Sequence, residues 1–183
     1  MLGAMAKVVA VHQTVVYLKQ QVDIRSKYRA AHRVARSLGK PLLVVGGPYG
    51  SPTNRLFRLK AHGCGDLCVD VDAFSCQGCT YQAGDVRALP FAGKEFGSAF
   101  CSHVLEHMAD LEELAAAYGE LRRVADHVLL CLPGKDSLVA WLPMHHLWVQ
   151  EVGGGMLKVE ERGGLKRKGF LTADAALAFP RER

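Results

Sequence analysis

Short apolar runs alternate with amphipathic segments along most of the chain. Leu42–Val45 and Val128–Leu132 are continuous apolar runs, and Ser98–Ser102 is uncharged and partly apolar. Leu67–Val71 and the shorter stretch 80–83 complete the set. Runs of this length and composition are typical of strands that are buried on both faces of a parallel sheet.

Helical spacing fills the segments before and between these strands. The apolar residues of Ala4–Gln21 follow a mixed pattern that predicts a helix, although many of them are β-branched. From residue 25 to 38 the spacing is more regular, and Gly39 and Pro41 end the segment. Ser51–Leu59 can form the helix that follows the first strand.

The strongest helix signal begins after Asp110. Asp110 is placed as the N-cap, and Glu113 stands three residues later as its capping-box partner. Glu112 and Glu113 lie in the first turn, where the helix dipole favours acidic side chains. The predicted buried face consists of Leu111, Leu114, Tyr118, Leu121 and Val124.

Strands that alternate with helices predict a Rossmann-like, doubly wound α/β fold with a mostly parallel sheet in a three-layer α/β/α arrangement. Residues 147–152 and 156–160 flank three glycines, which predicts an antiparallel hairpin at the sheet edge. At 183 residues we expect one domain. It divides into an N-terminal helix (1–24), a core (25–135) and a C-terminal hairpin and tail (136–183).

The charge balance gives a net charge of +5, with no long run of one sign. The basic residues of the loop 164–169, with Arg162 before them, are read as a solvated face, and nucleic-acid binding is not favoured because no aromatic residues are interleaved with them. The first seventeen residues are interrupted by polar side chains, so no transmembrane segment is expected. The N-terminal helix is expected to lie on the protein body or on a membrane surface.

Six cysteines are spread over the chain without a secretory signal before them, which favours reduced intracellular thiols and a cytoplasmic location. Cys64, Cys68, Cys76 and Cys79 raise the alternative of a structural zinc site. Against zinc, an extended chain would hold Cys64 and Cys68 roughly 13 Å apart. No residue is therefore assigned to a metal.

Three features typical of ligand sites follow one another along the chain. A Gly-rich turn, Gly46–Gly50, leaves the first strand, and its glycines allow a ligand to approach the backbone closely. Asp70 ends the second strand, where a carboxylate can accept hydrogen bonds from both hydroxyls of a ribose. Asp85 with Val86 can hold an adenine edge through one side-chain acceptor and one backbone donor. Together they predict a pocket for an adenosine-containing ligand.

The segment GDVRALPF and the segment HVLEHMADLEEL resemble the class I S-adenosylmethionine-dependent methyltransferases, and among them the group called type 11. The resemblance covers roughly residues 25 to 135 and implies S-adenosylmethionine as cofactor. It implies that Gly46, Gly47 and Gly50 line the methionine end, that Asp70 binds the ribose, and that Asp85 and Val86 bind the adenine. Ser102 and the candidate catalytic residue His103 would then lie beside the methyl group.

The chain departs from the family pattern at four positions. Val44 stands where the family usually has an acid, Pro48 and Tyr49 where it has small residues, and Gly97 where it has Asp. Pro48 removes a backbone donor and fixes its own φ.

The predicted function is methyl transfer to a small-molecule or lipid-like acceptor. The alternative is a methyltransferase-like fold without catalysis that serves as a binding or scaffold module. His145 and His146 precede the hairpin and face either the same cleft or the surface. The acceptor and the oligomeric state do not follow from the sequence.

Overall fold

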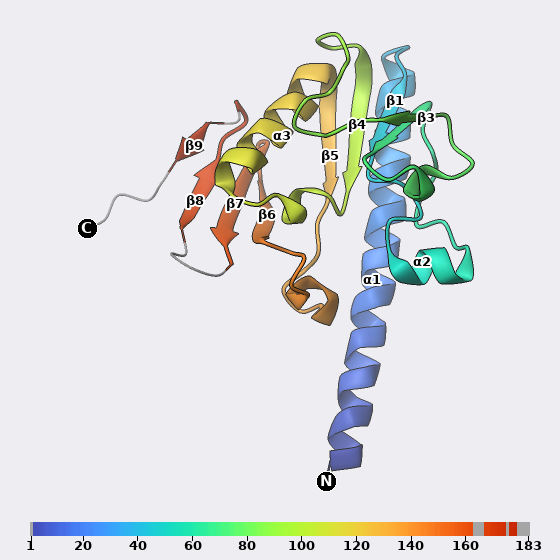
Figure 1. The fold of residues 1–183 in the computed structure, drawn as a ribbon, viewed down its shortest axis with the longest axis vertical. Coiled ribbons are helices and arrows are strands. Elements are labelled where there is room, and N and C mark those ends of the chain that lie inside the picture. The colour runs from blue at the N-terminus through green and yellow to red at the C-terminus, as the bar shows by residue number, and fades with distance from the viewer. Residues whose placement is uncertain (1, 163–166, 175, 179–183) are drawn as a thin grey trace.

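A computed structural model describes residues 2–162, 167–174 and 176–178. In these residues the central sheet has five strands in the order β3-β2-β1-β4-β5 (Figure 1). Each neighbouring pair is parallel, which confirms the predicted mostly parallel sheet. The strands are β1 (Leu42–Val45), β2 (Leu67–Asp70), β3 (Tyr81–Ala83), β4 (Phe96–Ser102) and β5 (Ala125–Cys131).

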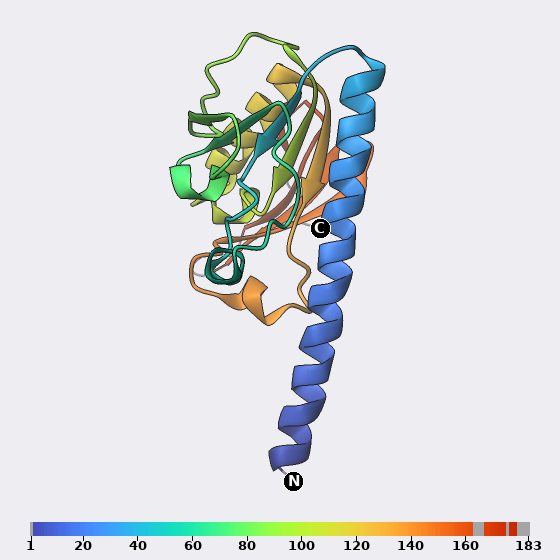
Figure 2. The same cartoon turned by 90° about the vertical axis from the view of Figure 1, so that its right-hand side faces the viewer.

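One long helix, α1 (Leu2–Ser37), covers one face of this sheet. It runs through the boundary predicted at residue 24, because no glycine or proline interrupts the chain between Ala4 and Leu38. Its C-terminal part packs against β4 and β5, and its N-terminal part extends beyond the body of the protein (Figures 1 and 2). The exposed apolar residues of the extending part include Met5, Val8 and Val11.

The contact between α1 and the sheet accounts for two departures from the family pattern. A Cβ on Gly97 would lie 2.9 Å from the Cα of Ala35, so glycine allows the helix to approach β4 closely. Ser98 donates a 2.7 Å hydrogen bond to the carbonyl of Ala31 in the same contact. Val44 is fully buried in the cluster on this side of the sheet, where an unpaired acid would be costly.

Helix α3 (Leu111–Val124) begins as predicted. The Asp110 carboxylate accepts from the backbone N–H of Glu113 at 2.8 Å, and the five predicted buried residues of the helix are all buried. The Glu113 carboxylate accepts from the N–H of Ala109 rather than from the cap residue itself. The short helices are α2 (Pro52–Phe57), η1 (Ala73–Cys76), η2 (Leu105–His107) and η3 (Leu138–Trp141).

The predicted hairpin is confirmed, but it belongs to a second sheet rather than to the edge of the first. In the described residues this sheet is antiparallel and contains β6 (Leu147–Gly153), β7 (Met156–Glu161), β8 (Lys168–Leu171) and β9 (Leu177–Ala178). Its apolar side chains pack in the same hydrophobic cluster as the buried face of α3. The Tyr118 hydroxyl of α3 donates to the Gly155 carbonyl. Of the predicted basic loop 164–169, residues 164–166 lie outside the described residues, and Lys168 and Gly169 are part of β8.

The expectation that all six cysteines are reduced is wrong. Within the described residues, disulfides join Cys64 to Cys79 and Cys68 to Cys76, while Cys101 and Cys131 are free and buried. The chain is not extended after Cys64, because Gly65 has a φ of +66°. Residues 73–79 then fold back through η1 and a turn at Gly78, which brings both pairs together.

No helix within the described residues is both long and apolar enough to cross a membrane. The cytoplasmic location stays a prediction.

The disulfides predict the number of free thiols. Unfolding the protein in an alkylating reagent without reductant should label only Cys101 and Cys131, because the other four sulfurs are bonded. Mass spectrometry of the intact chain reads the number of labels. A reduced sample, labelled at all six cysteines, is the control. Six labels without reductant would contradict the pairing.

The buried His62 predicts a pH dependence of stability. Burial lowers the pKa of His62 from 6.5 to about 4, although its hydrogen bond with the Gly63 carbonyl opposes the shift. As the pH falls from 6.5 to 4, the unfolded chain gains a proton that the folded chain does not. The titration of His62 should therefore lower the free energy of unfolding by about 3 kcal/mol over this window. Urea unfolding at several pH values measures it.

His62→Gln should remove this contribution to the slope, whatever it does to stability at pH 7. His12→Gln, at an exposed position of α1, is the matched control and should keep the slope. An unchanged slope in His62→Gln would show that another group is responsible.

Candidate functional site

The predicted cofactor residues gather at the carboxyl ends of the parallel strands. Val45 pairs with Val69 of β2 and with Cys101 of β4, so the three strands end side by side. Gly46 follows β1, Asp70 ends β2, and Ser102 ends β4. Ligands of open α/β sheets bind at this edge.

Gly46 connects the ends of β1 and β4. Its φ is +85°, a conformation that glycine adopts readily, and a Cβ there would lie 2.4 Å from the Ser102 carbonyl oxygen. Its N–H donates to the Val69 carbonyl at 3.1 Å. Gly46 therefore cannot be replaced without moving Ser102.

Asp70 is fixed by two backbone donors. One carboxylate oxygen accepts from the N–H of Gly47 at 2.9 Å, and the other accepts from the N–H of Asp72 at 2.9 Å. The side chain is partly buried. The predicted glycine turn and the predicted ribose acid are therefore in direct contact.

Residues 72–79 cover one side of the glycine turn. A Cβ on Gly47 would lie 2.1 Å from the Ser75 carbonyl oxygen, which also accepts a hydrogen bond from the Tyr49 N–H at 3.0 Å. Arg55 of α2 holds this segment through an ion pair with Asp72. The disulfide between Cys68 and Cys76 ties it to β2.

Asp85 lies close to Asp70 along the backbone, because the N–H of Gly84 donates to the Asp70 carbonyl at 3.3 Å. Its carboxylate accepts from the side chain and the backbone N–H of Arg87. These hydrogen bonds hold the pKa of Asp85 below its usual range. The side chain of Val86 is buried, so only its backbone could face a ligand.

His103 follows Ser102 with a φ of +53°, which is rare for a residue other than glycine. Its Nδ1 lies 3.1 Å from Glu106 Oε1, and its Nε2 lies 3.1 Å from the side-chain nitrogen of Gln20 in α1. An Nδ1–H that donates to Glu106 leaves the lone pair on Nε2, where the amide of Gln20 donates. The ring is held at both nitrogens, in an orientation that presents Nε2 as the basic atom.

Sequence reasoning did not assign a site role to Glu106, which is 1% exposed beside His107 and His145. Burial raises its pKa, but hydrogen bonding and attraction to His103 outweigh burial and lower it. His145 is also buried, and burial lowers its pKa. His146, its neighbour in sequence, is exposed. His145 lies about forty residues from Glu106, so spacing alone could not indicate this cluster.

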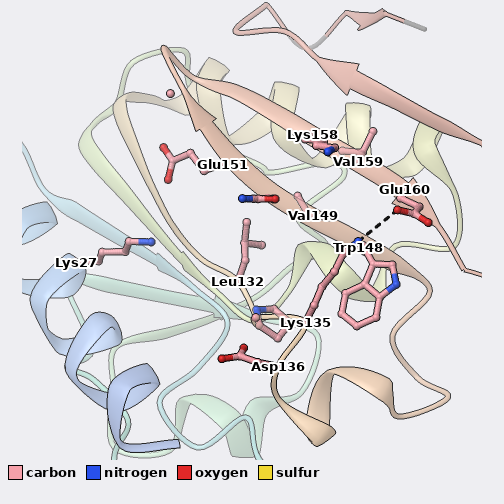
Figure 3. A pocket seen from close by; sticks show the side chains of 14 residues that line it. Lys27, Leu132, Lys135, Asp136, Trp148, Val149, Glu151, Lys158, Val159 and Glu160 are labelled. Atoms are coloured by element: carbon pink, nitrogen blue, oxygen red, sulfur yellow. Dashed lines mark hydrogen bonds and ion pairs between the residues drawn. The ribbon is translucent and has the colours of Figure 1, made fainter. Parts of the chain in front are cut away.

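A cavity of about 800 Å³ opens past the carboxyl end of β5 (Figure 3). Lys27 of α1 lines one side, and Trp148, Glu151 and Lys158 of the second sheet line the other. Leu132, which follows β5, lies between them. The N–H of His103 donates to the carbonyl of Cys131, the residue before Leu132, so the end of β5 that leads into the cavity lies next to the His103 backbone. None of its lining residues was predicted as a site residue.

Comparisons with solved structures give several distant similarities. The chain is 16% identical to the S-adenosylmethionine-bound amino pentose methyltransferase CalS10 from Micromonospora echinaspora, with a TM-score of 0.41 and coverage of 93% of this chain and 75% of that one. It is 14% identical to DesVI from Streptomyces venezuelae, with a TM-score of 0.43 and coverage of 88% and 74%. It is 19% identical to the sugar N-methyltransferase KedS8 from a Streptoalloteichus species, with a TM-score of 0.42 and coverage of 80% of this chain and 65% of that one.

Among curated proteins there is no match to the chain. The family model described as "Methyltransferase domain" matches residues 52–127, which include Asp70, Asp85, Ser102 and His103. Over this stretch, the resemblance to the class I methyltransferases that the sequence indicates is confirmed.

Proposed function

We propose that the chain is an S-adenosylmethionine-dependent methyltransferase that acts on a small molecule. The observation that carries the proposal is the contact between Gly47 N and the Asp70 carboxylate at the carboxyl edge of the sheet. It joins two of the proposed cofactor residues, and Asp70 lies in the stretch that matches a methyltransferase domain.

Asp70 fits the ribose end of such a cofactor. A carboxylate offers about four lone-pair positions, and backbone N–H groups occupy only two of them here. The remaining two can accept from the hydroxyls of a ribose. At the methionine end the fit is tighter, because the Ser75 carbonyl covers one side of Gly47.

The proposed roles of the other residues follow from their positions. The backbones of Gly46, Gly47 and Gly50 would line the methionine end, and Asp85 with the backbone of Val86 would hold the adenine. Ser102 would lie beside the methionine end as well. Bound S-adenosylmethionine supplies a methyl group on a positively charged sulfur.

His103 is proposed to take a proton from the acceptor. Its Nε2 carries the lone pair, and the Gln20 amide would have to move away before the acceptor could approach that atom. Methyl transfer depends chiefly on the positioning of the two reactants, and a base contributes when the acceptor nucleophile carries a proton.

We place the acceptor in the cavity past the end of β5. Its volume lies in the range of small-molecule sites, and it combines the aromatic ring of Trp148 with Lys27, Glu151 and Lys158. This lining suits a polar molecule with one apolar face better than a lipid chain.

The second candidate function is a binding module without catalysis. The cover that Ser75 forms over Gly47 favours it, because a cofactor must share that turn with the segment 72–79. Because two disulfides hold this segment, cofactor binding has to be measured with the cysteines both oxidised and reduced.

Calorimetry separates the two candidates. S-adenosylhomocysteine should bind with a stoichiometry of one, either to the protein as isolated or after its disulfides are reduced. Saturable binding in either state supports the enzyme. Folded protein that gives no heat at millimolar ligand in both states would leave only the binding module.

Asp70→Ala should weaken this binding by about 10- to 100-fold, because it removes two hydrogen bonds to a charged group. Asp126→Ala is the matched control. Asp126 pairs with Lys40 at the amino end of β5, on the opposite edge of the sheet, so its loss should leave the affinity unchanged. Equal affinities in the two variants would show that the ribose lies elsewhere.

A further inference from the structure

A second cluster of polar side chains lies directly beyond the proposed methyl-transfer site. Glu106 and His107 end the short helix η2, and His145 belongs to the loop before β6. One ligand-type atom from each residue lies within 4.8 Å of those of the other two. The loop is fixed to η2 because the N–H of His146 donates to the Glu106 carbonyl at 2.9 Å.

Two buried atoms in this cluster have no hydrogen-bond partner within the part of the chain that the structure describes. They are Oε2 of Glu106, whose residue is 1% exposed, and Nδ1 of His145, whose residue is 6% exposed. A buried polar atom without a partner is destabilising, and more so when the group is charged. Two such atoms in one cluster indicate a group that binds both.

Hydrogen bonds to the second polar atom of His107 and of Glu106 fix these side chains in the way that is typical of metal ligands. Nδ1 of His107 lies 2.9 Å from the Met144 carbonyl, so it carries the proton and donates, which leaves Nε2 of His107 as a free acceptor. The other oxygen of Glu106 contacts Nδ1 of His103. Metal-binding histidines and carboxylates typically use their second atom in this way.

We propose that Glu106, His107 and His145 bind one divalent transition-metal ion such as Zn²⁺. Two imidazoles and one carboxylate form a known zinc set that leaves a position open for water or a substrate oxygen. Imidazole nitrogen is a poor ligand for Mg²⁺ and Ca²⁺, which prefer oxygen.

The geometry requires a small closure of the side chains. Ligand atoms at ~2.1 Å from one ion lie at most ~4.2 Å apart, slightly less than the 4.8 Å limit within which these atoms fall. His107 is less buried than the other two residues, so its ring can make most of this movement.

A metal at this position gives the site a further property, which rests on the proposed function. The ion would share Glu106 with His103, so the metal would hold the carboxylate that orients the proposed base.

Cobalt and zinc binding to chelator-treated protein test the metal site without any cofactor. The disulfides are left intact, because reduced cysteines would form a competing site with sulfur ligands. We expect one Co²⁺ per chain, with absorption bands of nitrogen and oxygen ligands, displaced by Zn²⁺. Mg²⁺ should compete at least about 100-fold more weakly. Equal competition by Mg²⁺, or no saturable Co²⁺ binding, would overturn the assignment.

His107→Ala and Glu106→Gln should each weaken Co²⁺ binding at least about 100-fold, since even indirect ligand partners are worth 10- to 100-fold. His146→Ala is the matched control, because His146 is exposed and adjoins His145, and it should bind Co²⁺ as the native protein does. Circular dichroism verifies the fold of each variant. Native affinity in folded His107→Ala would overturn the proposal, and so would a loss in His146→Ala alone. Because no cofactor is present, these results are independent of those for S-adenosylhomocysteine.

Discussion

The parallel register of β1 with its two neighbours is the constraint on which the site depends. Val45 is aligned with Val69 on one side and with Cys101 on the other, so three strand ends coincide. This alignment brings Gly47 within hydrogen-bond distance of Asp70. A shift of β2 by one residue would turn the Asp70 side chain to the other face of the sheet.

Helix α1 stabilises this register from one face and also shapes the site. It approaches β4 closely at Gly97, and Val44 is buried in the cluster that this helix forms with the sheet. One part of the same helix supplies Gln20, which holds His103, and another supplies Lys27 at the cavity. Val44 and Gly97, two of the four departures from the methyltransferase pattern, both lie in the contact with this helix. The other two departures, Pro48 and Tyr49, lie beside the segment 72–79, because the Tyr49 N–H donates a hydrogen bond to the Ser75 carbonyl.

Much of the fold follows from local sequence patterns. The features that the sequence did not predict depend on contacts between residues far apart in the chain. The strands were predictable because each is a short apolar run. Helix α3 was predictable because its Asp110 cap and its buried face lie within one short segment. Asp70 could be predicted as a strand-end acid for the same reason. The disulfides could not, since four cysteines allow several pairings and the fold of residues 73–79 brings the paired cysteines together. The cluster of Glu106 with His145 depends on a loop that returns from the second sheet.

The central claim is that the cofactor binds at the carboxyl edge of β1 and β2, with Asp70 on its ribose. A crystal structure of the protein with S-adenosylhomocysteine measures this directly. The account predicts both ribose hydroxyls within hydrogen-bond distance of the Asp70 carboxylate, with the adenine near Asp85. A ligand bound away from this edge, in the cavity lined by Trp148 for example, would contradict it.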